Sequence, residues 1–113
     1  MILSLPMARK KRQLVMMGPD RNGSAGALGA RREVRETFAR FNTAPDGSNK
    51  DSMGLERLHG PGMVVEIATS VDPVTQAVAS INDEDIALPV LFKLCKTTGW
   101  RLMDMESGRI FGG

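Results

Sequence analysis

The sequence predicts a small α+β fold, in which one main helix packs across a mostly antiparallel sheet of three to four strands in a ββαββ-like order. From Met63 to Thr69, the large apolar residues Met63, Val65 and Ile67 alternate with Val64, Glu66 and Ala68, as in a strand with one buried face. An apolar stretch follows the acidic residues 83–85 and ends at Gly99, as in a buried helix. The segments Trp100 to Met105 and Arg109 to Phe111 then flank Glu106-Ser107-Gly108, as in a hairpin. A chain of 113 residues has room for one such domain with flanking segments.

Shifts in composition predict four segments. Residues 1–29 are expected to form a flexible, basic and glycine-rich arm, although Gln13 to Met17 has the length and apolar character of a strand. Residues 30–42 are expected to form a helix. Residues 43–62 are rich in Gly, Pro, Ser, Asn and Asp, which is typical of a linker. Residues 63–113 are therefore predicted to be the α+β core domain.

The helix over residues 30–42 supplies the predicted interface. Val34, Phe38 and Phe41 fall at i, i+4 and i+7, which places them on one side of a helix. A core of about fifty residues buries little apolar surface and is marginally stable alone. We therefore expect these three residues to dock on the sheet or on a partner.

The segment from Val74 to Ile81 has two interpretations. Asp72 followed by Pro73 is a good start for a helix. As a strand, the same segment pairs with Met63 to Thr69 in a hairpin. We favour the strand, because the apolar helix that follows needs a sheet to cover.

That following helix is the clearest element. Asp85 is predicted as its N-cap, so that Pro89 falls within the first four positions, whose N–H groups lack helical partners. Gly99 is predicted to end it in the left-handed conformation. Lys93, Lys96 and Thr97 form its narrow polar side.

Charge is distributed unevenly along the chain. The first 50 residues carry ten Lys and Arg against four acids, whereas residues 51–113 carry five against nine. Met7, just before the basic run, is a second candidate start of translation. Phosphate groups of nucleic acid are natural partners of such a basic segment. The candidate polyanion-binding residues are Arg9, Lys10, Lys11, Arg12, Arg31, Arg32 and Arg35.

No catalytic, cofactor-binding or metal-ligating set is predicted. One cysteine and one histidine cannot supply a zinc site, and Cys95 near a helix C-terminus is expected to be a buried apolar residue. The acidic residues 83–85 are explained by a helix start. Residues 18–32 contain G-x-x-G-x-x-G before a helix, which matches neither the dinucleotide fingerprint nor the phosphate loop.

The leading hypothesis is a small non-enzymatic interaction module that forms a homo-oligomer or binds a protein partner. Nucleic-acid or polyanion binding through the basic arm is the alternative, and nucleotide binding or a small enzyme using residues 18–32 is a weaker one. The single cysteine and the lack of a secretory pattern favour a cytoplasmic location. No apolar run approaches the ~18 residues of a membrane span, so no membrane partner is expected.

Overall fold

In the computed structural model of the chain, residues 12–21, 24–45, 54–68 and 72–112 are described. They form eight strands and two helices. In chain order these are β1 (Arg12–Met17), β2 (Asp20–Arg21), β3 (Ser24–Ala25), α1 (Arg31–Ala39), β4 (Leu55–Gly60), β5 (Met63–Ala68), β6 (Gln76–Ile81), α2 (Glu84–Thr98), β7 (Arg101–Asp104) and β8 (Ile110–Gly112).

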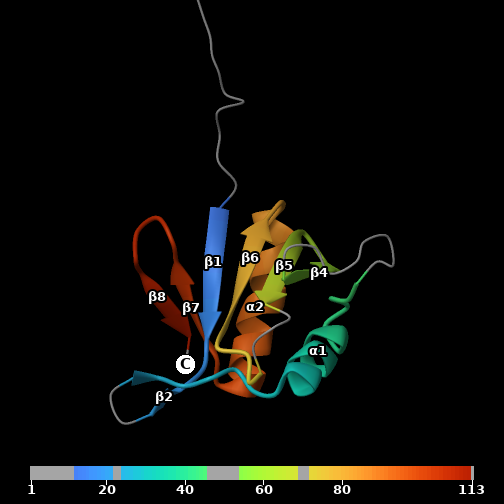
Figure 1. Cartoon of the computed structure of the whole chain (residues 1–113). Helices are drawn as coiled ribbons and strands as arrows, with labels where there is room; N and C mark the ends of the chain where they lie inside the picture. Colours follow the sequence, from blue (N-terminus) through green and yellow to red (C-terminus); the bar gives the residue numbers. More distant parts are fainter. Residues whose placement is uncertain (1–11, 22–23, 46–53, 69–71, 113) are drawn as a thin grey trace, which may run out of the picture.

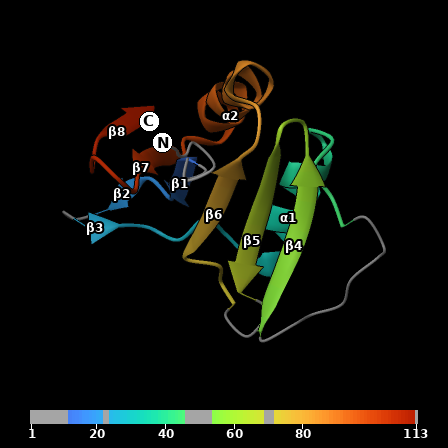
Figure 2. The ribbon, with the colours of Figure 1, turned by 90° about the horizontal axis from the view of Figure 1, so that it is seen from above.

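Six of the strands form one antiparallel sheet in the order β4-β5-β6-β1-β7-β8, and β2 and β3 form a separate hairpin. Figure 1 shows β1 in the middle, with β7 and β8 on one side and β6, β5 and β4 on the other. The two helices lie over different parts of this sheet (Figure 2). α1 is tied to β4 by the ion pair between Arg35 and Glu56, and α2 reaches β8 through a ring contact between Phe92 and Phe111.

The predicted α+β class with a mainly antiparallel sheet is confirmed, but the predicted strand number is wrong. The sheet has six strands instead of three to four, and the ββαββ-like order is not matched. Two of the additional strands, β1 and β4, come from residues assigned to the arm and the linker. β1 is buried on both faces at Leu14, Val15 and Met16, so it lacks the alternation of a half-buried strand. β4 buries only Leu58 among its six residues, so its apolar signal is weak.

One face of the sheet carries the core. Met63, Val65 and Ile67 of β5 are buried and alternate with partly exposed residues, and their partners on β6 are buried too. Buried residues of both helices join this same cluster, namely Val34, Phe38, Ala87, Leu91, Leu94 and Cys95. Val15 is 5% exposed yet lies outside the cluster, because it projects to the opposite face. Both helices therefore cover one face of the sheet.

The strand interpretation of residues 74–81 is confirmed over Gln76–Ile81. This strand, β6, pairs antiparallel with β5 on one side and with β1 on the other. Asp72 does cap a helix, but a different one: its Oδ1 accepts a hydrogen bond from the Arg31 N–H at the start of α1, at 3.1 Å. α1 needs this partner because its own N-cap residue, Ala30, has no side-chain acceptor.

The predicted N-cap of α2 is wrong by two residues. Asp83, not Asp85, precedes the helix, and its Oδ1 accepts a hydrogen bond from the Ile86 N–H at 3.3 Å. Pro89 therefore lies beyond the first four positions, inside the helix. It is tolerated because it lies on the exposed side, where water can reach the Asp85 carbonyl oxygen that lacks its helical partner.

Two glycines fix the ends of α2. Gly99 has φ of 84° and donates its N–H to the Cys95 carbonyl at 2.7 Å, which confirms the predicted left-handed end. Gly62, in the β4–β5 turn, has φ of 66° and accepts hydrogen bonds from the N–H groups of Asn82 and Asp83. A Cβ at position 62 would lie 2.7 Å from the Asp83 carbonyl oxygen. The turn therefore contacts the start of α2 directly.

We predict that Gly99→Val lowers the free energy of unfolding by about 1–2 kcal/mol, because a β-branched residue is strained at positive φ. Gly62→Ala should cost more than Gly99→Ala, because it adds a backbone clash to the same strain. Urea unfolding followed by circular dichroism measures these effects. Thr97→Val, in the last turn of α2 at helical φ, is the control, and equal losses for Val at positions 97 and 99 would contradict the prediction.

Candidate interaction surface

The structure places the predicted interface residues mostly inside the molecule. Val34 and Phe38 are 1% and 0% exposed, and Phe41 is partly buried against the core. The Phe38 ring packs on Trp100, with ring centroids 5.6 Å apart. α1 therefore uses this side to dock on its own sheet. The apolar surface available to a partner lies elsewhere.

Of the predicted polyanion-binding residues, the four that the structure describes, Arg12, Arg31, Arg32 and Arg35, do not form one exposed basic surface. Arg9, Lys10 and Lys11 lie outside the described residues. Arg32 pairs with Glu36 at 3.5 Å and Arg35 with Glu56 at 3.2 Å, so the chain's own carboxylates balance much of the charge on α1. Arg31 lies next to them at the start of the helix and is partly buried.

Arg12 has a structural position that the sequence did not indicate. From β1 its Nε donates to Asp104 Oδ2 and its Nη1 to Glu84 Oε1, both at 3.0 Å. Asp104 Oδ1 also accepts the N–H groups of Glu106 and Ser107, at 2.9 and 3.2 Å. These two backbone hydrogen bonds and the Arg12 guanidinium lower the pKa of the Asp104 carboxyl below its ordinary value of 3.8. Arg12 thereby joins β1, the β7–β8 turn and the start of α2.

The glycine-rich segment 18–32 does not present a phosphate cradle within its described part. The N–H of Gly18 donates to Gly26, that of Gly26 donates to Pro19, and that of Leu28 donates to Val74. At the start of α1, the Asp72 carboxylate already occupies the position where a phosphate would bind a helix N-terminus. This arrangement gives the nucleotide hypothesis no support.

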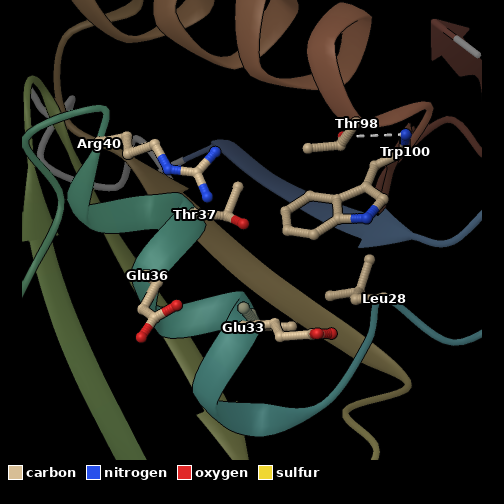
Figure 3. Close-up of a pocket in the computed structure, with 8 residues that line it drawn as sticks. Leu28, Glu33, Glu36, Thr37, Arg40, Thr98 and Trp100 are labelled. Atoms are coloured by element: carbon tan, nitrogen blue, oxygen red, sulfur yellow. Dashed lines mark hydrogen bonds between the residues drawn. The ribbon is translucent and has the colours of Figure 1, made fainter.

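A shallow cleft of about 400 Å³ lies between α1 and the end of α2 (Figure 3). Glu33, Glu36, Thr37 and Arg40 line it from α1, and Trp100 lies across from them. Trp100 is only 4% exposed, and its backbone N–H donates to the Thr98 hydroxyl at 3.1 Å. The cleft thus exposes mainly charged and hydroxyl groups of α1 over a buried aromatic floor.

The outer side of α2 exposes apolar side chains, although the sequence predicted a buried helix. Ile86 is 50% and Phe92 45% exposed, and Pro89 between them is exposed as well. Phe92 contacts the Phe111 ring of β8 at 6.4 Å between centroids. The signal was in the spacing, because Ile86, Pro89 and Phe92 recur every three residues and face away from the buried stripe of Ala87, Leu91 and Leu94. We call Ile86, Pro89 and Phe92 the α2 outer patch; Phe111 of β8, which is partly buried against the core, lies beside it.

The chain's single cysteine, Cys95, has the environment of a core residue. Cys95 is buried in the core, and this burial raises the pKa of its thiol to about 11. His59 lies on β4, where its backbone pairs with Ala44. Among the described residues, no group of three His, Cys, Asp or Glu could hold a metal ion.

Comparison with protein-family models, curated proteins and solved structures finds no match to this chain. Within the described part of the chain, no helix is long and apolar enough to cross a bilayer. The residues and their geometry therefore carry the functional argument.

We predict that Asp104→Asn lowers stability at neutral pH and that its difference from the parent shrinks as pH falls. The pKa of the Asp104 carboxyl is lower in the folded than in the unfolded protein, so the carboxylate stabilises the fold at pH values above its ordinary pKa of 3.8. This stabilisation is lost as pH falls through the lower pKa of the folded state. Urea unfolding from about pH 6 to about pH 2 measures the difference. Glu33→Gln, which removes an exposed carboxylate of α1, is the control. A difference that is constant with pH would contradict the prediction.

We predict that Cys95 reacts with an aromatic disulfide reagent at pH 8 only after the protein unfolds. A thiol with pKa near 11 is almost wholly protonated at that pH, and its sulfur is also inaccessible. Absorbance of the released thiolate gives the rate. Thr97→Cys, which adds an exposed thiol two residues along, should release one equivalent rapidly from the folded protein; equal rates at the two positions would contradict the burial of Cys95.

Proposed function

We propose that this chain is a small non-enzymatic interaction module that assembles with itself or binds a protein partner through apolar surface. The carrying observation is the α2 outer patch, where Ile86 and Phe92 are about half exposed six residues apart, with the exposed Pro89 midway between them. Such side chains scattered singly are normal on a protein surface, whereas a contiguous group is typical of an interaction site.

The size of the domain also supports the proposal. A single-layer sheet with helices on one face has a thin core, and small domains bury a low fraction of the surface that their unfolded chains expose. On the opposite face, Val15 is only 5% exposed, and the apolar area that remains for a partner lies at Ile110, which is 50% exposed. Burial of further apolar area against a partner stabilises a domain of this kind by about 25 cal/mol per Å² before the costs of association.

The buried position of Val34 and Phe38 changes how the interface is tested. Aspartate at either position would place an unpaired charge in the core, so it would unfold the chain rather than separate two folded copies. Variants that probe association must therefore lie on the α2 outer patch, whose residues contribute less to the core.

Polyanion binding by the basic N-terminal residues is the competing proposal. It rests on the excess of Lys and Arg over acids in the first 50 residues. Arg12, Arg32 and Arg35 form ion pairs with carboxylates of the same chain. These pairs make the three arginines less available to a polyanion.

We predict that sedimentation equilibrium shows a molecular mass that rises with concentration, and that Phe92→Ser shifts the association to higher concentration by about tenfold or more. Replacing Arg9, Lys10 and Lys11 by Ser removes the charges that polyanion binding would need and should leave the mass unchanged. Circular dichroism verifies that each variant is folded. A monomer at every concentration, together with tight and salt-sensitive binding to an oligonucleotide, would replace this proposal with polyanion binding.

A further inference from the structure

The α2 outer patch lies at the centre of the exposed side of its helix. Ile86, Pro89 and Phe92 follow one another at intervals of three residues, on the side opposite to the buried Ala87, Leu91 and Leu94. In Figure 1, α2 lies behind β6. A second helix could therefore approach its outer side without displacing any strand.

Unlike charges lie at the two ends of this exposed side. Asp85 is at the N-terminal end, and Lys93 and Lys96 are at the C-terminal end, all of them exposed. None of the three has an ion-pair partner among the described residues. The neighbouring acids differ in this respect, because Asp83 caps the helix and Glu84 pairs with Arg12.

We propose that α2 packs antiparallel against α2 of a second copy, with a twofold axis passing near Pro89. This inference rests on the proposed self-assembly and names its surface. In an antiparallel pair, the acidic end of each helix lies beside the basic end of the other, and the apolar residues of both meet in the middle. The two helix dipoles also run in opposite directions, which is the favourable arrangement. A parallel pair would instead bring like charges together.

β8 widens the surface beside the helix. Phe111 contacts Phe92, and the guanidinium of Arg109 lies 5.4 Å from the centroid of the Phe111 ring. The aromatic pair gives the shared surface an apolar border, and Arg109 adds positive charge on the β8 side. The acidic end of a second helix would be drawn to this positive charge and to the two lysines.

The other exposed surfaces fit a second copy less well. The outer edge of β4 is partly occupied, since His59 exchanges backbone hydrogen bonds with Ala44. The open face of the sheet carries an apolar row, Val78, Val15, Met103 and Ile110, beside the charged pair Arg57–Glu66 and the polar Gln13 and Gln76. The edge of β4 is therefore partly protected from pairing, and on the open face Arg57 and Glu66 already pair with each other, so they do not orient a second copy as the charges beside the α2 outer patch do.

Charge exchange tests the arrangement directly. Asp85→Lys makes both ends of the patch positive, and Lys93→Asp with Lys96→Asp makes both ends negative. Each variant alone should raise the dissociation constant of the dimer by about tenfold or more, because the repulsion occurs twice in a twofold pair. The triple variant has its charges reversed at both ends, so it should regain most of the affinity. Glu33→Lys on α1 makes the same charge change as Asp85→Lys away from the patch and should have no effect.

Sedimentation velocity at low salt measures all five proteins, with circular dichroism to show that each is folded. If the parent is a monomer at every concentration, both the self-assembly and this surface are excluded. If the parent dimerises and Asp85→Lys dimerises equally well, self-assembly stands but the α2 surface is wrong. If the single reversals weaken the dimer and the triple variant fails to recover, the antiparallel arrangement is wrong. Mixing the two like-charged variants should produce a heterodimer that neither forms alone.

Discussion

The fold depends on the insertion of β1 between β6 and β7. Hydrogen bonds to both neighbours join strands that lie on either side of α2 in the sequence into one sheet. Leu14 and Met16 of β1 face the helices, whereas Val15 faces the opposite side. Without this strand, the hairpins β4–β5–β6 and β7–β8 would have unpaired inner edges, and α2 would cover two separate pieces of sheet. At the start of β1, the ion pairs of Arg12 with Asp104 and Glu84 also connect this strand to β7 and to α2.

The position of β1 also determines which surfaces remain for function. Both helices cover the same face of the sheet, so the apolar side of α1 is buried in the core and is not available to a partner. α2 is longer and apolar around more of its circumference, so it covers the core with one side and still exposes Ile86 and Phe92 on the other. A helix that covers a single sheet buries only one side, so apolar residues on its other side are exposed even though the helix is apolar around most of its circumference.

Electrostatics have mainly a structural part in the described residues. Arg35 of α1 pairs with Glu56 of β4, and Arg12 of β1 pairs with Asp104 of β7 and Glu84 of α2. These arginines therefore connect elements that are far apart in the sequence. Exposed pairs of this kind contribute little stability individually, and the partly buried Arg12–Asp104 pair with its additional backbone hydrogen bonds is the stronger one. The charges left over at the ends of α2 are those that remain available to steer a partner.

The sequence by itself determined the local elements whose signals are short-range. The left-handed end of α2 at Gly99, the turn at Gly108, the alternation in β5 and the burial of Cys95 all follow from neighbours within a few residues. Only the tertiary structure decided the number of strands, the capping of α1 by Asp72 and the partners of Arg12, since these join residues far apart in the chain. It also decided the candidate site: helical periodicity placed Val34 and Phe38 on one side of α1, but whether that side meets the sheet or a partner depends on which face the sheet leaves open.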